Sequence, residues 1–411
     1  MQTNLADFIR DTPEGREADA ILRKCVHCGF CTATCPTYQL LGDELDGPRG
    51  RIYLIKQVLE GVEVTATTQL HLDRCLTCRA CETTCPSGVE YGRLADIGRK
   101  IVEERVSRGA WDSIQRAVLS AVLPSTRVFG ALLSVGRLFG PLLPAQIAAK
   151  VPAPGAAAGA WPAPRHARKM IALAGCVQPA LAPAINAAAA RVLDRLGISL
   201  IEAPDAGCCG AVRFHLNRQE AGKADMRSLI DAWWPLVESG AEAIVMTASG
   251  CGATVKEYGH LLKDDAAYAK KAERISALTL DLAEVLAKER PAIEKLFSAR
   301  PSHKEKAAFH SPCTLQHGQQ VQGQVEPLLQ AAGYDLTSVP DAHLCCGSAG
   351  TYSILQPGLS LRLRAGKLAA LHTGMPVRIA TANIGCLTHL QSGTGTPVEH
   401  WIQLIDRQLT G

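Results

Sequence analysis

The chain has 411 residues, of which 47% are hydrophobic, and its formal net charge is +4. A chain of this length is usually too long to fold around a single hydrophobic core, so two or three domains are expected. Acidic and basic residues are interspersed without a long basic run, so the sequence predicts no nucleic-acid partner.

The N-terminus predicts a cytoplasmic location. Residues 1–20 contain no positively charged start followed by an apolar core, so no signal peptide is expected. The 16 cysteines should then remain reduced, because cytosolic thiols rarely form disulfides.

Two cysteine runs near the N-terminus share the spacing C-x2-C-x2-C-x3-C-P. The first run is Cys25, Cys28, Cys31 and Cys35-Pro36, and the second is Cys75, Cys78, Cys81 and Cys85-Pro86. This spacing is typical of bacterial two-cluster ferredoxins, in which the fourth cysteine of each run serves the other cluster. The expected ligands are Cys25, Cys28, Cys31 and Cys85 for one 4Fe-4S cluster, and Cys75, Cys78, Cys81 and Cys35 for the other. Zinc is disfavoured, because structural zinc sites usually group their cysteines as two separated C-x2-C pairs.

Residues 1–110 are expected to form an α-helical ferredoxin domain around these runs. Apolar residues recur at helical spacing in residues 51–60 and 94–106. Three basic residues lie near the cluster ligands in sequence: Arg49, Arg51 and Arg79. They could offset the negative charge of the thiolates, or they could be exposed and solvated.

Residues 111–168 are expected to form an apolar helical segment and a linker. Residues 118–150 are apolar, but their longest stretch without a charge or a proline, 128–136, is too short to span a bilayer. The segment could lie on a membrane surface, or it could be a helical pair packed against the protein or a partner. Residues 151–164 are rich in proline, alanine and glycine, so the main domain boundary is placed there.

A second cysteine pattern also occurs twice. Its members are Cys176, Cys208-Cys209-Gly210 and Cys251, matched by Cys313, Cys345-Cys346-Gly347 and Cys386. The first interval is 32 residues in both copies, and the last is 42 in one and 40 in the other. The pattern indicates a duplicated module, here called the first cysteine-rich module, residues 169–300, and the second cysteine-rich module, residues 301–411.

Each cysteine-rich module is predicted to be an α/β unit with a parallel sheet. The expected strands are 169–175, 199–202 and 243–247 in the first module, and 306–310, 336–339 and 377–381 in the second; residues 186–196 should be helical. The fold class is therefore α+β multidomain. The cysteines follow the carboxyl ends of strands, where open α/β sheets gather ligands. Four thiolates per module could bind a further iron–sulfur centre or zinc.

The order of these motifs resembles a family that contains the iron–sulfur subunits of glycolate oxidase, anaerobic glycerol-3-phosphate dehydrogenase and heterodisulfide reductase. The segments most similar to bacterial glycolate oxidase iron–sulfur subunits are 25–61, 73–89, 206–217, 247–259 and 343–352. The likeness spans nearly the whole chain and is weakest across residues 110–168.

The resemblance implies the iron–sulfur subunit of a flavin-dependent glycolate dehydrogenase, with D-lactate as a further substrate. Partner subunits would carry FAD, and this chain would pass electrons through two 4Fe-4S clusters to a quinone at the inner face of the inner membrane. The chain has no G-x-G-x-x-G after a strand and no G-x-x-x-x-G-K-[ST], so it is not expected to bind the flavin itself.

The sequence departs from the family pattern at the end of each module. Heterodisulfide reductase modules end in C-x2-C, whereas Thr254 and His389 stand at the last of these positions here. The missing thiolate argues against the alternative function, a catalytic disulfide or quinone reductase. His389 could ligate a metal or cap a helix. A third alternative is a zinc-bearing scaffold that only docks partners.

Overall fold

The computed structural model describes residues 1–140, 152–298 and 305–410. The end of the predicted apolar segment, the first linker residue and the predicted module boundary at residue 300 lie outside the described residues. The chain forms two compact units. The first unit comprises residues 1–117 and 343–367, and the second comprises residues 118–342 and those from 368 onward.

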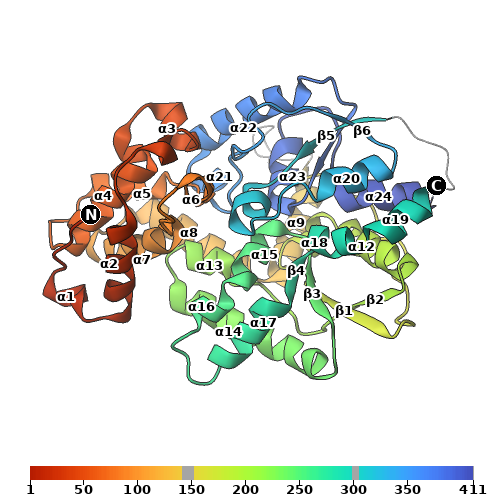
Figure 1. Ribbon diagram of the computed structural model, residues 1–411, viewed down its shortest axis with the longest axis horizontal. Helices are drawn as coiled ribbons and strands as arrows, with labels where there is room; N and C mark the ends of the chain where they lie inside the picture. Colours follow the sequence, from red (N-terminus) through yellow and green to blue (C-terminus); the bar gives the residue numbers. More distant parts are fainter. Residues whose placement is uncertain (141–151, 299–304, 411) are drawn as a thin grey trace. The chain divides into compact units, whose positions relative to one another are not determined.

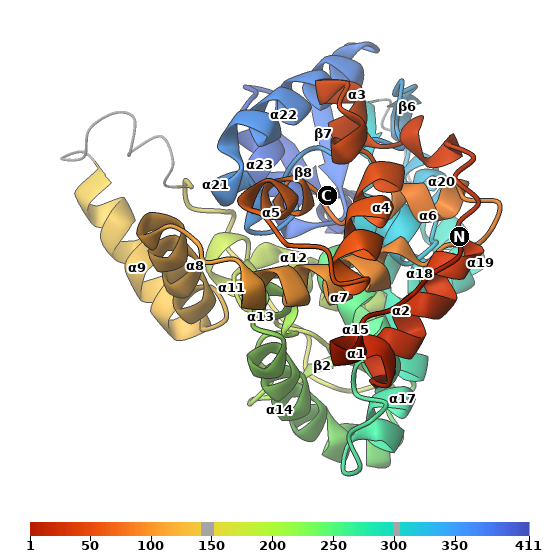
Figure 2. The same cartoon turned by 90° about the vertical axis from the view of Figure 1, so that its left-hand side faces the viewer.

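The N-terminal part of the first unit is helical. Its elements are α1 (Asp7–Arg10), α2 (Pro13–Lys24), η1 (Phe30–Thr32), α3 (Pro36–Leu41), η2 (Glu44–Asp46), α4 (Pro48–Leu59), α5 (Ala66–Asp73), α6 (Ala80–Thr84) and α7 (Tyr91–Arg105). Helices α2, α3 and α4 each begin with a proline. Proline is favoured at the first position of a helix, because the backbone N–H that it lacks would have no partner within the helix there. Helices α2 and α4 pack against α7 through the fully buried Leu22, Ile55 and Leu94 (Figure 2). The predicted helices at 51–60 and 94–106 are confirmed as α4 and α7.

The second unit contains the predicted strands. The first cysteine-rich module has β1 (Arg168–Ala172), α11 (Gln178–Leu181), α12 (Ala184–Arg195), β2 (Ile198–Glu202), α13 (Ala211–His215), α14 (Gln219–Glu238), β3 (Ala243–Met246), α15 (Ser249–Lys256), α16 (Tyr258–Leu261), α17 (Ala269–Leu278), β4 (Thr279–Asp281), α18 (Leu282–Lys288) and α19 (Arg290–Ser298). The second module has β5 (Lys306–His310), η4 (Thr314–Gly318), α20 (Val325–Ala331), β6 (Asp335–Thr337), α21 (Tyr352–Leu355), α22 (Pro357–His372), β7 (Arg378–Thr381), α23 (Ile384–Gln391), β8 (Val398–His400) and α24 (Trp401–Thr410). Of these elements, α21 and most of α22 belong to the first unit.

Both sheets are parallel and have equivalent strand orders. The first is β2-β1-β3-β4, whose strands are labelled in Figure 1. The second is β6-β5-β7-β8. Corresponding pairs have corresponding register, for example Ala172 beside Val245 and His310 beside Thr381. The predicted parallel sheets are thus confirmed, and the sheets also contain two short edge strands that the sequence analysis did not predict, β4 and β8.

The two sheets share one hydrophobic core. It joins residues of both modules, among them Ile185 on α12 and Trp401 on α24, which are fully buried. Helices α12 and α24 pack together, and an ion pair of 2.6 Å between Arg191 and Asp406 lies beside this contact. The cysteine-rich modules therefore stabilise each other through this shared core, and the first module has a second apolar cluster of its own.

A buried histidine connects the two modules and should make their stability depend on pH. His400 Nε2 donates to the carbonyl of Thr247 at 2.8 Å, and Nδ1 accepts from the amide of Ile402 at 3.3 Å. Burial lowers the pKa of His400 to about 4, against the weaker opposing effect of the Thr247 carbonyl. Between about pH 6.5 and 4 the unfolded chain binds a proton that the folded chain does not, so the free energy of unfolding should fall by about 3 kcal/mol as pH decreases through this window.

Urea unfolding at pH 7.5, 6 and 5 measures this dependence, with His400→Gln as the control that removes the titrating group. The variant should be less stable at pH 7.5 but should lose less stability on acidification. Equal acid sensitivity of the variant and the wild type would show that His400 does not cause it.

Two helices follow the ferredoxin part, α8 (Ala110–Val122) and α9 (Thr126–Phe139). Helix α9 packs against α11, and Leu133 is buried, while Leu132 and Leu138 are exposed. Among the described residues no single helix is both long and apolar enough to cross a membrane; α8 and α9 reach that composition only together and meet at a bend of 110°.

Candidate functional site

Two cavities lined by thiols lie in the first unit. The first has a volume of about 440 Å³ and is lined by five cysteines: Cys25, Cys28, Cys31, Cys81 and Cys85. The second has a volume of about 320 Å³ and is lined by four: Cys35, Cys75, Cys78 and Cys81. None of the 16 cysteines, all of which lie within the described residues, forms a disulfide. Because iron–sulfur clusters are held by cysteine thiolates, these side chains fit such clusters.

The two loops that carry the thiols have the same backbone conformation. Two residues after the first cysteine of each run, His27 and Thr77 have φ angles of 58° and 53°. The residue after the second cysteine has a φ of 87° at Gly29 and 61° at Arg79. Left-handed backbone at a non-glycine residue costs about 1–3 kcal/mol and persists where the surroundings require it. Here it directs three thiols of each run toward one cavity.

A buried cation lies beside the second cavity. The Arg51 side chain is 1% exposed, and its Nη2 lies 3.4 Å from Asp46 Oδ1. Its Nε donates to the carbonyl of His71 at 2.7 Å. Burial raises the pKa of Cys75, but the positive charges of Arg51 and Arg99 outweigh this effect, so the pKa is lowered. The second cavity thus contains a thiol whose ionised form is favoured by fixed positive charge.

The first cavity has a different electrostatic environment. Burial raises the pKa of Cys31 to about 11, and the charge of Cys25 adds to this effect. Arg49 lines the cavity, but it is 35% exposed and pairs with Glu44 at 2.6 Å. Cys28 is exposed. Of the three arginines considered from the sequence, only Arg51 is buried, since Arg49 and Arg79 are partly exposed.

The four thiols of the first cysteine-rich module lie together in the second unit. Cys176 follows β1, Cys208 and Cys209 precede α13, and Cys251 lies in the first turn of α15. The thiols of Cys176 and Cys209 donate to Cys208, which lowers the pKa of Cys208 and raises the pKa values of the two donors. The Cys209 thiol also donates a hydrogen bond to the sulfur of Cys251. This sulfur set could hold zinc or an iron–sulfur centre.

The glycine after each adjacent cysteine pair allows a helix to approach closely. Gly210 has a φ of 83°, and a Cβ there would lie 2.5 Å from the carbonyl oxygen of Gly222 in α14. Gly347 has a φ of 88°, and a Cβ there would lie 2.6 Å from the carbonyl oxygen of Ser360 in α22. Another residue would strain the backbone and clash with the helix, so both modules require glycine for the same reason.

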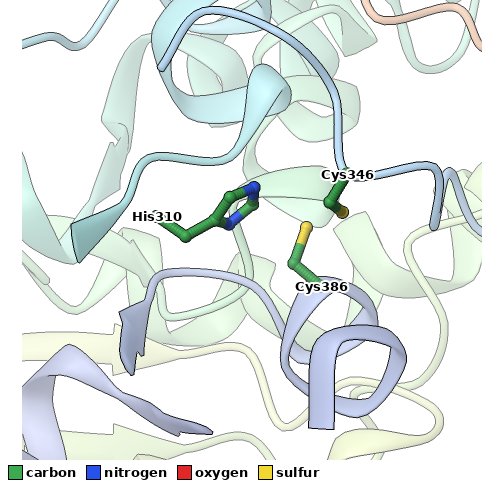
Figure 3. Close-up of side chains that lie close together, drawn as sticks. All are labelled: His310, Cys346 and Cys386. Atoms are coloured by element: carbon green, nitrogen blue, oxygen red, sulfur yellow. The ribbon is translucent and has the colours of Figure 1, made fainter. Parts of the chain in front are cut away.

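In the second cysteine-rich module a histidine joins the cysteines. Ligand atoms of His310 and Cys386, which both belong to the second unit, lie within 4.8 Å of each other, and both residues are buried. Figure 3 shows the imidazole ring of His310 beside the Cys386 sulfur atom. Cys313 immediately precedes the η4 turn, and Cys345 Sγ accepts from the amide of Gly347 at 3.4 Å.

Comparison with known proteins identifies both parts of the chain. Residues 21–89 match the family model described as a 4Fe-4S dicluster domain. Residues 171–256 and 307–391 each match the model described as a cysteine-rich domain. The glycolate oxidase iron–sulfur subunit of Escherichia coli (strain K12) is 59% identical over 409 residues, which cover 100% of this chain and 99% of that protein.

The chain belongs to the glycolate oxidase iron–sulfur subunit family. A more distant relative, the probable glycolate oxidase iron–sulfur subunit of Bacillus subtilis (strain 168), is 30% identical over 90% of this chain and 89% of its own length. Lactate utilization protein A of Bacillus licheniformis is 26% identical over 51% of this chain and 85% of its own length. The predicted family and fold class are therefore confirmed.

His310 is the candidate ligand that the sequence analysis of this family member missed. The only signal available was a histidine three residues before Cys313, at the end of a predicted strand. His389, which was considered instead, lies in the last turn of α23.

Proposed function

We propose that this chain is the electron-transfer subunit of a flavin-dependent glycolate dehydrogenase, which oxidises glycolate to glyoxylate. The main support for this proposal is the pair of thiol-lined cavities in the first unit. Clusters bound there would accept and donate single electrons. The identity to a protein named glycolate oxidase iron–sulfur subunit supports the choice of substrate.

The proposed ligand sets are those expected from the sequence. Cys25, Cys28, Cys31 and Cys85 would hold one 4Fe-4S cluster, and Cys75, Cys78, Cys81 and Cys35 the other. The lining of the two cavities supports this division, because Cys85 lines only the first cavity and Cys35 only the second. Cys81 lines both cavities.

Electrons are proposed to enter at the first cavity from a partner subunit that carries FAD. Two apolar residues that line this cavity, Val26 and Phe30, are 69% and 61% exposed. Together with the exposed Cys28 they offer an apolar surface close to the cluster. A cluster in the second cavity, beside buried Arg51, would receive the electrons next and pass them on toward a quinone.

The complex is proposed to work at the inner face of the inner membrane, with a quinone as acceptor. Exposed apolar residues on α9, including Leu132, Leu138 and Phe139, supply a surface for peripheral contact with lipid or with a membrane-bound partner. D-lactate is proposed as a further substrate of the complex, and the similarity to lactate utilization protein A supports it.

A second candidate function is a disulfide or quinone reductase that acts through the cysteine-rich modules. The lowered pKa of Cys208 favours it, because a thiolate is the reactive form of cysteine. Cys208→Ser separates the candidates. If acceptor reduction were lost while both cluster signals remained, the reductase would replace the electron-transfer role, and unchanged turnover would exclude the reductase.

The purified chain, prepared without oxygen, should contain at least about eight irons, four for each cluster, and should not oxidise glycolate by itself. Addition of the flavin-carrying partners should restore glycolate-dependent reduction of a quinone analogue. Iron analysis and the turnover assay check these results. Glycolate oxidation by the chain alone would contradict the subunit role, and zinc in place of iron would contradict the electron-transfer role.

A further inference from the structure

We propose that the second cysteine-rich module holds a metal ion through His310 and Cys386, in a nitrogen-and-thiolate site whose histidine is replaced by leucine in the first module. His310 is 2% exposed and Cys386 is 4% exposed. A ring nitrogen of His310 and the Cys386 sulfur lie within 4.8 Å of each other (Figure 3). A metal held here would be a centre separate from the two clusters of the ferredoxin part.

The repeat itself shows what is special about His310. Three residues before the first cysteine, the first module has Leu173 where the second module has His310. Leu173 is 4% exposed and packs in an apolar cluster. Leucine offers no ligand, so the same position of the fold has an apolar side chain in one copy and a metal-binding side chain in the other.

The surroundings of His310 support a ligand role. Its Nδ1 lies 3.0 Å from the hydroxyl of Thr381, on the adjacent strand β7. Metal-binding histidines usually donate the N–H of the other ring nitrogen to such a partner, which fixes the tautomer and the ring orientation. With Nδ1 as the donor to Thr381, Nε2 would be the ring nitrogen that binds the ion.

The donor atoms select the class of metal. Imidazole and thiolate suit zinc or iron, whereas magnesium and calcium prefer oxygen ligands. With bonds of about 2.0–2.3 Å, two ligands of a tetrahedral ion lie about 3.5 Å apart. The observed group needs only small side-chain movements to reach this spacing. A further ligand would come from Cys313, which immediately precedes the η4 turn in the same unit.

The decisive variant is His310→Leu, which introduces the residue of the first module at the matching position. Elemental mass spectrometry of the full chain should show the loss of one metal ion per chain, with the paramagnetic signals of both 4Fe-4S clusters unchanged. Loss of zinc or loss of iron identifies the ion. His310→Cys should retain the ion, because a thiolate replaces the imidazole as ligand.

His317→Leu is the matched control, because His317 is also buried in the second module but lies outside the ligand group. It should keep the full metal content. Unchanged metal content in His310→Leu, or a wild-type chain with no metal beyond its two clusters, would overturn the proposal. If His310→Leu lost turnover but kept its full metal content, the proposed metal site would be wrong, and the electron-transfer role of the chain would be unaffected.

A measurement on the wild type keeps the proposal testable if His310→Leu does not fold. For zinc, X-ray absorption should show a nitrogen ligand at about 2.0–2.1 Å beside sulfur. For iron, pulsed paramagnetic resonance on chain labelled with 15N-histidine should show coupling to the label. A shell of sulfur alone, or no coupling, would overturn the assignment.

Discussion

Cys85→Ser is expected to remove the cluster of Cys25, Cys28 and Cys31 and to leave the cluster of its own run in place. The Cys85 side chain lines the first cavity and not the second. Serine is a poor replacement for a thiolate ligand, so the variant should lose about half of its iron, four of about eight atoms. Iron analysis and paramagnetic resonance of the reduced chain measure the loss.

Reference variants identify which cluster is lost. Cys28 lines only the first cavity and Cys78 only the second, so Cys28→Ser and Cys78→Ser define the spectrum of each remaining cluster. The spectrum of Cys85→Ser should match that of Cys28→Ser, and Cys35→Ser should match Cys78→Ser. If Cys85→Ser matched Cys78→Ser instead, each run would hold its own cluster and the crossed assignment would be wrong.

Arg51→Met should destabilise the first unit strongly and lower the reduction potential of the second cluster. The Arg51 guanidinium and the Asp46 carboxylate are 1% and 0% exposed, and loss of one partner from such a buried pair costs about 3–5 kcal/mol. Arg74 and His71 also contact Asp46, at 2.8 and 3.0 Å, so the lower end of this range is expected. Reduction adds negative charge, which becomes less favourable without the neighbouring cation.

Arg49→Met is the matched control, two residues away on the same helix. Its ion pair with Glu44 is 35% and 43% exposed, so its removal should change the free energy of unfolding by less than about 1 kcal/mol. Arg51→Lys should recover most of the potential but not all of the stability, because lysine keeps the charge and loses the forked hydrogen bonds. Equal potentials in Arg51→Met and the wild type would show that Arg51 has only a structural role.

The sequence was sufficient to predict those strands that have a recognisable local pattern. The strands β1, β3, β5 and β7 were predicted because each is an apolar run that ends shortly before a cysteine. The edge strands β4 and β8 have three residues each, too few for a periodic pattern to be recognised. Their place in the sheet depends on pairing with β3 and β7, which is a tertiary effect.

Spacing also predicted the thiols of the site but could not predict their electrostatic surroundings. Arg49 and Arg51 look equivalent in sequence, yet residues two apart on a helix point about 200° away from each other. Helix α4 therefore turns Arg51 toward Asp46 in the interior and leaves Arg49 at the surface. His310 was missed because its significance depends on a cysteine far along the chain, Cys386.

Within the first unit, the hydrogen bond from Tyr352 to Arg74 joins the ferredoxin part to a segment that is synthesised much later. The Tyr352 hydroxyl donates to the carbonyl of Arg74, the residue before Cys75, at 3.1 Å and across 278 positions of the chain. Arg362 makes a similar contact with the carbonyl of Leu40. Domains usually fold in the order in which they leave the ribosome. Here the segment that carries both ferredoxin runs emerges early but must wait for residues 343–367 before its packing is complete, so iron–sulfur assembly would work on a partly open chain.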